Sequence, residues 1–400
     1  MTATVHEVLD RRLLSISPAP IAVALSGGGD SLALTLMVAD WATARGRSLL
    51  VLTVDHGLSA QSAAWTKSCA GTADRLGANF RGLAWEGGKP ATGLPAAARA
   101  ARHGLIADAA RAAGAKVVLM GHTASDRLEA AAMRQEGAST PSPREWTPSP
   151  AWPQGRDLFL LRPMLSRTRA EIRTWLAERG ETWIEDPANE DARFARARAR
   201  ASLTGDETDD VLPGPVLADL ALATCDLAGG LAAPRTLLRR APPAFLAAAC
   251  LCAAGTSRPP RSDRLKRLAD TLGGDTDFAA TLAGARIEAD QRDVRFLRDP
   301  GRAGLEPLSL AAGQAAVWDG RFEITTERHI AIQALAGHAA RLSPASRSAL
   351  QRLPAGGRGG LPFIRGEGSP VLAAISGVMA RPLPLDRLRA ACGLIDREPA

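Results

Sequence analysis

The residues with the clearest chemical meaning lie near the start of the chain, between two apolar stretches. The run IAVAL, residues 21–25, predicts a buried strand, and the segment SGGGDS, residues 26–31, then leads into a stretch with helical spacing. Glycines let successive backbone N–H groups converge on an anion, and the following helix adds the positive end of its dipole. The segment therefore predicts a phosphate-binding loop, although glycines alone would fit an ordinary turn equally well.

The loop is neither a Walker A motif nor a dinucleotide-binding motif, because it lacks the Gly-Lys-Ser/Thr ending and the glycine spacing that these require. Its pattern Ser-Gly-Gly-x-Asp-Ser resembles the pyrophosphate-binding loop of the PP-loop ATPases, which cleave ATP to AMP and pyrophosphate. The resemblance implies that ATP contacts the whole loop, namely Ser26, Gly27, Gly28, Gly29, Asp30 and Ser31.

Two further strand ends carry polar residues. In VDHGL, residues 54–58, Asp55 is placed to meet a ribose or to support the loop, and His56 could offer main-chain groups to an adenine. The alternative is a polar strand end closed by a turn glycine. In GHTASDRLE, residues 121–129, Asp126 and Glu129 share a helical face, which suits a cationic substrate or Mg²⁺. The alternative is that both acids only complement the helix dipole.

A basic segment follows at residues 192–200, ARFARARAR. Arg193, Arg196 and Arg200 share a helical face with a spacing that suits phosphate contacts. The alternative is a solvated basic face, which the adjoining Asp-Pro-x-Asn turn makes less attractive.

Strands and helices that alternate along the chain must position these groups. Apolar runs and helix-closing glycines predict strands at 21–25, 48–55, 79–86 and 116–122, with helices at 31–45, 59–76 and 95–113 between them. Such alternation predicts an α/β fold, with a parallel sheet covered by helices on both faces and ligands at the carboxyl ends of the strands.

The rest of the chain predicts a different organisation. Residues 137–157 are rich in Pro, Ser and Thr and predict a long mobile loop. A strand at 158–162 then precedes a helix whose Thr168 and Glu171 have capping-box spacing. The acidic, Pro-containing stretch at 205–215 predicts a boundary, followed by a helical region to about 270 and short strands beyond about 280, at 285–289, 294–297, 315–318, 322–325 and 371–375. We therefore expect a PP-loop ATP-binding catalytic domain (1–205), a helical linker region (206–280) and a small α+β domain (281–400).

The composition of the chain limits the kinds of partner and cellular compartment that we expect. The formal charge of +7 over 400 residues fits a polyanionic partner. Five scattered cysteines without a Cys-x-x-Cys pair indicate a reducing compartment and no zinc or cluster site. No signal peptide or membrane-spanning run is recognised, so the expected location is the cytoplasm, without a membrane partner.

The order of the motifs is similar to that of the tRNA(Ile)-lysidine synthases. The resemblance covers the first 200 residues and rests on SGGGDS, VDHGL, GHTASDRLE, LLRPMLSRTRAEIRTWL and WIEDPANEDARFARARAR. It implies that ATP adenylates the C2 carbonyl oxygen of the wobble cytidine in a tRNA(Ile) with a CAU anticodon. The ε-amine of L-lysine then displaces AMP to form lysidine.

The resemblance also assigns roles. Asp30 would act in catalysis near Mg²⁺ and pyrophosphate, while Asp126 and Glu129 match acids associated with lysine, Asp126 also counting as catalytic. Arg196 matches a segment linked to tRNA and catalysis, with Arg193 and Arg200 as neighbouring tRNA contacts. A tRNA substrate further implies that the helical linker region (206–280) is also a tRNA-binding region. The oligomeric state is left open, with a homodimer as one option.

The chain departs from the family pattern at several positions. Ser125-Asp126-Arg127 stands where two adjacent aspartates and a glutamine are usual, and residues 196–200 depart from Arg-Asn-x-Ile-Arg. Near Arg99 and Arg102 the usual Asn and Glu are missing, and His103 replaces a tyrosine. Two alternatives therefore stay open: a PP-loop tRNA thiolase, which would need cysteine chemistry near Cys69, and a non-catalytic RNA-binding relative.

Overall fold

The computed structural model describes residues 1–135, 142–186, 223–365, 369–370, 374–375 and 377–400. Internal contacts divide the chain into unit 1, which comprises Met1–Leu212 and Ile395–Ala400, and unit 2, which comprises Pro213–Leu394. The three domains expected from the sequence stay a prediction, since their first boundary, at 205/206, lies outside the described residues.

Unit 1 is built on a six-stranded sheet with the order β3-β2-β1-β4-β6-β5. All neighbouring strands are parallel except β5, which runs antiparallel to β6 at the edge. The strands are β1 (Ile21–Ala24), β2 (Leu49–Asp55), β3 (Asn79–Ala84), β4 (Val117–Met120), β5 (Trp146–Pro148) and β6 (Phe159–Leu161). The predicted α/β fold with a parallel sheet is confirmed.

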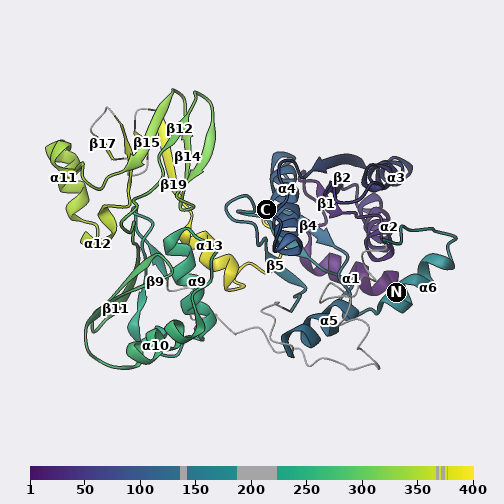
Figure 1. Cartoon of the computed structure of the whole chain (residues 1–400), viewed down its shortest axis with the longest axis horizontal. Helices are drawn as coiled ribbons and strands as arrows, with labels where there is room; N and C mark the ends of the chain where they lie inside the picture. Colours follow the sequence, from purple (N-terminus) through teal and green to yellow (C-terminus); the bar gives the residue numbers. More distant parts are fainter. Residues whose placement is uncertain (136–141, 187–222, 366–368, 371–373, 376) are drawn as a thin grey trace. The chain divides into compact units, whose positions relative to one another are not determined.

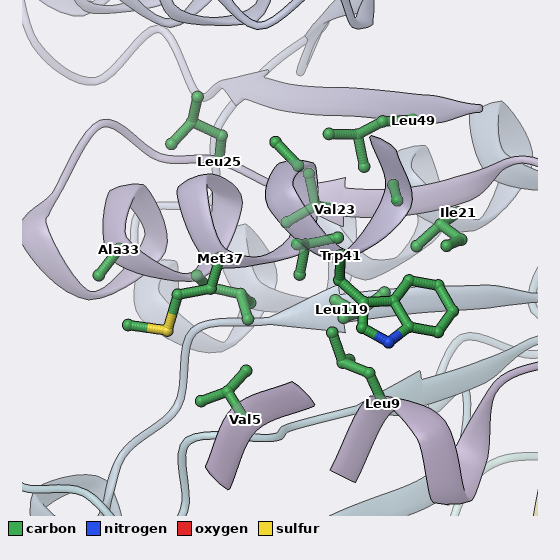
Figure 2. Packing of buried hydrophobic residues seen from close by; sticks show 14 of the residues in the cluster. Val5, Leu9, Ile21, Val23, Leu25, Ala33, Met37, Trp41, Leu49 and Leu119 are labelled. Carbon is green, nitrogen blue, oxygen red and sulfur yellow. The ribbon is translucent and has the colours of Figure 1, made fainter. Parts of the chain in front are cut away.

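The helices of unit 1 among the described residues are α1 (Thr2–Arg12), α2 (Gly29–Ala44), α3 (Ser62–Arg75), α4 (Leu94–Ala112), α5 (Ala124–Gln135) and α6 (Arg169–Ala177). Because successive strand residues point to opposite faces, Ile21 and Val23 join one core and Ala22 joins another. The first core gathers side chains of α1, α2, α3 and α6, and the second those of α4. Figure 2 shows the first core, with Leu9 of α1 and Trp41 of α2 close to the strand residues.

The strand order reverses at β1, and this reversal determines where a ligand can bind. The chain passes from β1 outward through β2 to β3, and then returns to place β4 on the other side of β1. In open α/β sheets, the crevice at the carboxyl ends of strands beside such a reversal is the usual ligand site. The loop after β1 and the start of α5 after β4 both lie at this crevice.

Two parts of unit 1 differ from the sequence-based expectation. Helix α1 was not predicted, although Val5, Val8 and Leu9 bury one face of it in the core. The expected mobile loop at 137–157 contains β5, so that prediction is wrong for its described part. Trp146 stacks on Phe159 of β6 at 5.0 Å between ring centroids, and an edge position tolerates Pro148.

Unit 2 combines antiparallel sheets with short helices (Figure 1). A five-stranded sheet has the order β7-β8-β11-β10-β9, and two four-stranded sheets have the orders β12-β15-β16-β17 and β13-β14-β19-β18. Helix α9 is the centre of the core beside the first sheet, and its Cys250 and Cys252 are buried there. The strands are β7 (Thr224–Cys225), β8 (Leu231–Pro234), β9 (Phe278–Leu282), β10 (Ala285–Ala289), β11 (Asp293–Arg298), β12 (Leu308–Leu310), β13 (Ala315–Trp318), β14 (Phe322–Thr326), β15 (Ile330–Ala334), β16 (Pro362–Ile364), β17 (Ser369–Pro370), β18 (Ala374–Ile375) and β19 (Val378–Pro382). The helices are α8 (Arg235–Leu238), α9 (Pro243–Ala254), α10 (Ser262–Gly273), η3 (Ala339–Arg341), α11 (Pro344–Gln351), α12 (Ala355–Arg358) and α13 (Pro384–Ala391).

The expectation of an all-helical stretch to about 270 was incomplete, since β7 and β8 lie in it. Both are short, and β8 pairs with β11, which lies about 60 residues further along the chain. The strands expected at 285–289, 294–297, 315–318 and 322–325 are present as β10, β11, β13 and β14. Of the strand expected at 371–375, residues 374–375 form β18 and the others lie outside the described residues.

The last residues of the chain, Ile395–Ala400, belong to unit 1 (Figure 1). Trp146 donates from Nε1 to the carbonyl of Ile395 at 2.7 Å. Glu398 forms an ion pair with Arg47, Nη2 to Oε1 at 2.8 Å, and both side chains are only 1% exposed. The backbone N–H of Leu14 also donates to Glu398. In the described part of the chain, no helix is long and apolar enough to cross a membrane.

Candidate active site

The glycine loop predicted from the sequence connects β1 to α2. The Ser31 hydroxyl accepts from the backbone N–H of Ser26 at 3.2 Å and donates to the carbonyl of Gly28 at 2.9 Å. Helix α2 begins at Gly29, so its first N–H groups point toward the loop. The strand, turn and helix order of an anion-binding loop is therefore present.

A segment after α6 packs against this loop and explains one of its glycines. The backbone N–H of Ile184 donates to the carbonyl of Gly27 at 2.9 Å. Gly27 has a φ of +85°, and a Cβ there would lie 2.3 Å from Ile184 Cδ1. A Cβ on Gly29 would lie 3.4 Å from Trp183, which is an ordinary van der Waals contact. The left-handed backbone therefore favours glycine at 27, whereas position 29 has room for a Cβ.

The end of β4 reaches the same loop. A Cβ on Gly121 would lie 2.9 Å from the carbonyl oxygen of Asp30, so only glycine allows this approach. Two residues later Thr123 precedes α5, and its N–H and hydroxyl both donate to Asp126 Oδ2, at 2.6 and 2.9 Å. One oxygen of Asp126 therefore serves the helix start, as the alternative interpretation expected.

Arg169, at the first position of α6, joins the predicted acids into one cluster. It donates from Nε to Asp30 Oδ2 at 3.1 Å and from Nη1 to Glu129 Oε1 at 3.0 Å, and its Nη2 lies 3.6 Å from Asp126 Oδ1. The exposed fractions of the Asp126 and Glu129 side chains are 8% and 1%. The structure thus brings Asp30, Asp126 and Glu129 together around a single guanidinium.

Burial and charge oppose each other in this cluster. Burial raises the pKa of Asp30, Arg169 lowers it, and the nearby charge of Asp126 raises it again, so that the net direction is upward. Burial lowers the pKa of Arg169, but the charges of Asp30, Glu129 and Asp126 outweigh this effect and raise it. The guanidinium stays charged, and the buried acids have a strong preference for cations.

Sequence reasoning did not single out Arg169, although a signal lay beside it. The predicted capping box is confirmed: Thr168 Oγ1 accepts from the N–H of Glu171 at 3.2 Å, and Glu171 Oε2 accepts from the N–H of Thr168 at 2.7 Å. This box fixes where α6 begins, and the N–H of Arg169 donates to the Ser125 hydroxyl of α5 at 3.2 Å. Ser125, a departure from the family pattern, thus links the two helices.

A group of cationic side chains includes Arg162, which follows β6 and contacts His122 after β4. Arg162 is buried, and it donates to His122 Nδ1 at 3.3 Å and to Thr147 Oγ1 at 3.1 Å. Burial and the charge of Arg99 lower the pKa of Arg162 to about 10, against the opposing effect of Asp126. Positive charge therefore lies within electrostatic reach of the acid cluster, which suits a site for an anionic and a cationic substrate together.

His103 of α4 lies near these arginines, and its imidazole is held neutral. Burial, followed by the charges of Arg102 and Arg99, lowers its pKa to about 3. Its Nε2 is buried and has no hydrogen-bond partner among the described residues. A protonated His103 would add a buried charge beside several arginines, so the folded chain resists its protonation.

Acid should therefore destabilise the chain through His103. The unfolded state takes up this proton below an ordinary pKa of about 6.5, whereas the folded state stays neutral until about pH 3. Stability is consequently lost as the pH falls from about 6.5 toward 3, by about 2 kcal/mol at pH 5 relative to pH 8. We expect His103→Phe to remove this difference, measured as the free energy of unfolding at both pH values. The exposed His329→Phe serves as the control, and parallel losses in wild type and His103→Phe would contradict the prediction.

The positions of Asp55 and His56, at the end of β2, fit both an ordinary turn and a ligand contact. Asp55 Oδ1 accepts from the N–H of Gly57 at 2.7 Å, which is the turn that the alternative interpretation expected. The His56 ring lies edge-on to Trp85, with 6.0 Å between centroids, and burial followed by the charge of Arg102 lowers its pKa. His56 Nδ1 is buried without a partner in the described part of the chain. Arg193, Arg196 and Arg200 lie outside the described residues.

Comparisons with known proteins agree with this arrangement. The model of a PP-loop domain family matches residues 1–207. A tRNA(Ile)-lysidine synthase of Caulobacter vibrioides is 48% identical over 98% of both chains. The chain belongs to the tRNA(Ile)-lysidine synthase family. Other members are 34% identical: one from Hyphomonas neptunium, with 74% of this chain and 86% of the relative covered, and one from Rhizobium meliloti, with 80% and 77% covered.

Membership of this ATP-binding PP-loop family means that the chain uses ATP. The thiolase alternative finds no support in the catalytic unit of this lysidine synthase family member. Cys69 is the only cysteine in the sequence before residue 213, and it is buried beneath the loop. Burial raises the pKa of its thiol, which disfavours the thiolate that sulfur transfer needs.

Proposed function

We propose that this chain joins L-lysine to the wobble cytidine of tRNA(Ile) with a CAU anticodon. In the first step the C2 carbonyl oxygen attacks the α-phosphorus of ATP and pyrophosphate leaves. In the second step the ε-amine of lysine attacks C2, the C2–O bond breaks, and AMP leaves with that oxygen. A carbonyl oxygen is a poor leaving group until it carries AMP, which is why ATP is required.

The loop between β1 and α2 is the proposed ATP site. The hydroxyl of Ser26 and the amides of Gly27, Gly28 and Gly29 would donate to phosphate oxygens, while Ser31 holds the loop in shape through the bonds described above. Asp55 and His56 would contact the adenosine. His56 Nδ1, buried without a partner among the described residues, supports a polar contact there.

Mg²⁺ fits this site with ATP but not as a fully protein-held ion. Among the described residues, no group of three His, Cys, Asp or Glu side chains gathers as metal ligands. Mg²⁺ ordinarily takes one or two carboxylates together with substrate phosphates, and the partly exposed Asp30, with Asp126 nearby, offers such donors. Asp30 would hold the ion, which when bound would offset the charge of the phosphates.

Asp126 and Glu129 are the proposed lysine site. Their carboxylates are almost fully buried and already bind one cation, the guanidinium of Arg169. A substrate ammonium entering beside Arg169 would find the same charge-assisted hydrogen bonds. The amine that attacks C2 must first lose a proton, starting from a pKa of about 10.4, and buried carboxylates are suitable groups to orient it.

The tRNA contacts proposed from the sequence are Arg193, Arg196 and Arg200, with Arg196 also acting in catalysis. Their spacing in the sequence, which would place them on one face of a helix, and the formal charge of +7 support this proposal. A cytoplasmic location and the oligomeric state stay predictions.

The observation that carries the proposal is the cluster of three acids around Arg169 beside an ATP loop. The test is incubation of the full chain with ATP, Mg²⁺, radiolabelled lysine and tRNA(Ile). We expect label in the RNA only when ATP is present, and one pyrophosphate released for each lysine joined. ATP-dependent sulfur transfer without lysine incorporation would favour a thiolase, and binding of tRNA without either reaction would favour a non-catalytic relative.

The lysine site makes a separate prediction. Asp126→Asn and Glu129→Gln keep the shape of each side chain but remove its charge, so the KM for lysine should rise roughly 10- to 100-fold for each. Adenylation, measured as tRNA-dependent pyrophosphate release without lysine, should change far less. The pair Glu7→Gln and Asp40→Asn, exposed acids of unit 1, is the matched control. An unchanged KM for lysine in both variants would indicate that the two acids only cap the helix.

A further inference from the structure

A pocket of about 450 Å³ in unit 2 gathers arginines outside the site described above. It lies between the connection from α9 to α10 and the turn from β9 to β10. Its lining consists of arginines, apolar residues, a glycine and one threonine, with no acidic side chain among the described residues: Thr256, Arg258, Pro259, Pro260, Arg261, Arg264, Leu282, Ala283, Gly284 and Arg298.

Internal bonds fix one wall of this pocket. Arg298 donates to Asp319 at 2.9 Å and, through Nη1, to the carbonyl of Gly284 at 3.2 Å. Gly284 has a φ of +84°, and a Cβ there would lie 3.0 Å from Arg298 Nη1. The charge of Arg298 is thus offset by Asp319, and its side chain braces the turn. Pro259 and Pro260 restrict the backbone on the other side.

The remaining three arginines supply unbalanced positive charge. Arg258, Arg261 and Arg264 follow at intervals of three residues, all are exposed, and none has an ion-pair partner in the described part of the chain. The neighbouring Arg267, by contrast, pairs with Asp263 at 3.0 Å. Helix α10 begins immediately after Arg261, so the positive end of its dipole adds to the same potential. Three like charges around one concavity repel one another unless an anion joins them.

We propose that this pocket binds phosphate groups of the tRNA backbone, an inference that rests on the proposed function. Guanidinium groups match phosphate oxygens with paired hydrogen bonds, and three of them converge here. In the described lining no aromatic ring and no carboxylate or amide side chain is present to read a base edge. The pocket therefore contributes affinity and positioning rather than base recognition.

The test compares two sets of substitutions in the full chain. The pocket variant carries Arg258→Gln, Arg261→Gln and Arg264→Gln. The matched control carries Arg302→Gln, Arg341→Gln and Arg347→Gln, three exposed arginines of unit 2 that do not line the pocket. Affinity for tRNA(Ile) is measured against salt concentration. The slope of log affinity against log salt should fall by about one for each lost phosphate contact in the pocket variant only.

Activity measurements separate this proposal from the function itself. In the pocket variant the KM for tRNA should rise at least 10-fold while kcat stays within twofold, because the groups around Arg169 are untouched. Superimposable binding curves for the two variants, with an active wild type, would overturn the pocket proposal alone. Absence of lysidine formation by wild type would instead refute the proposed function. Calorimetric binding of pyrophosphate that is lost in the pocket variant, with unchanged tRNA affinity, would identify a small-anion site and also overturn the proposal.

Discussion

Asp30→Asn should abolish adenylation while the chain stays folded. Asp30 follows the glycine loop at the start of α2, and its carboxylate faces Arg169 at 3.1 Å. Losing this charge removes the proposed carboxylate ligand of Mg²⁺, and the ion would otherwise offset the charge of the departing pyrophosphate. Removing one electrostatic group of this kind typically costs 10²- to 10³-fold in rate, so tRNA-dependent pyrophosphate release should fall by roughly that factor or more.

Two companion variants make this result interpretable. Asp30→Glu restores the charge and should recover part of the activity, whereas a purely structural role would not favour it over Asn. Asp74→Asn removes an exposed carboxylate of α3 in the same unit and should leave pyrophosphate release unchanged. Near-normal release by a folded Asp30→Asn protein would show that the acid cluster does not serve the ATP step.

Glu398→Gln should destabilise unit 1, although residue 398 is far in sequence from Arg47, its ion-pair partner. Arg47 and Glu398 are each 1% exposed, and removal of one partner leaves a buried charge without compensation. Breaking such a pair typically costs about 3–5 kcal/mol in free energy of unfolding. Hydrogen exchange would locate the effect, because the N–H of Leu14, which donates to Glu398 at 2.8 Å, should lose protection.

A control variant and a double variant test whether the lost ion pair causes this destabilisation. Asp396→Asn changes an exposed acid two residues away and should alter stability by less than about 0.5 kcal/mol. The double variant Arg47→Met, Glu398→Met removes both charges and should be far more stable than Glu398→Gln alone. A loss no greater than that of Asp396→Asn would mean that Arg47 is not dependent on the C-terminal residues.

The local parts of the catalytic fold could be predicted from the sequence. The strand at 21–25 and the loop at 26–31 follow from apolar runs and glycine punctuation, and the structure places β1 at Ile21–Ala24 and α2 from Gly29. The capping box at Thr168 could be predicted for the same reason, because all its atoms lie within four residues.

Long-range contacts were not accessible in this way. Arg169 reaches Asp30 across 139 residues of chain, and no periodicity or turn chemistry indicates that pair. The need for glycine at 121 comes from its close approach to Asp30, which depends on the order of strands β1 and β4. Short strands such as β7 and β8 are stabilised by their pairing partners, and their sequences are too short to show a clear alternation of apolar and polar residues.

The return of the chain's last residues to unit 1 has a consequence for biosynthesis. Domains usually fold in the order in which the ribosome makes them. Here all of unit 2, Pro213–Leu394, precedes the residues that complete unit 1, Ile395–Ala400. Arg47 therefore has no Glu398 partner until all of unit 2 has been synthesised, although most of unit 1 precedes unit 2 in the chain. A chain that stops before residue 398 would carry every residue of the ATP loop and still lack the partner of a buried charge.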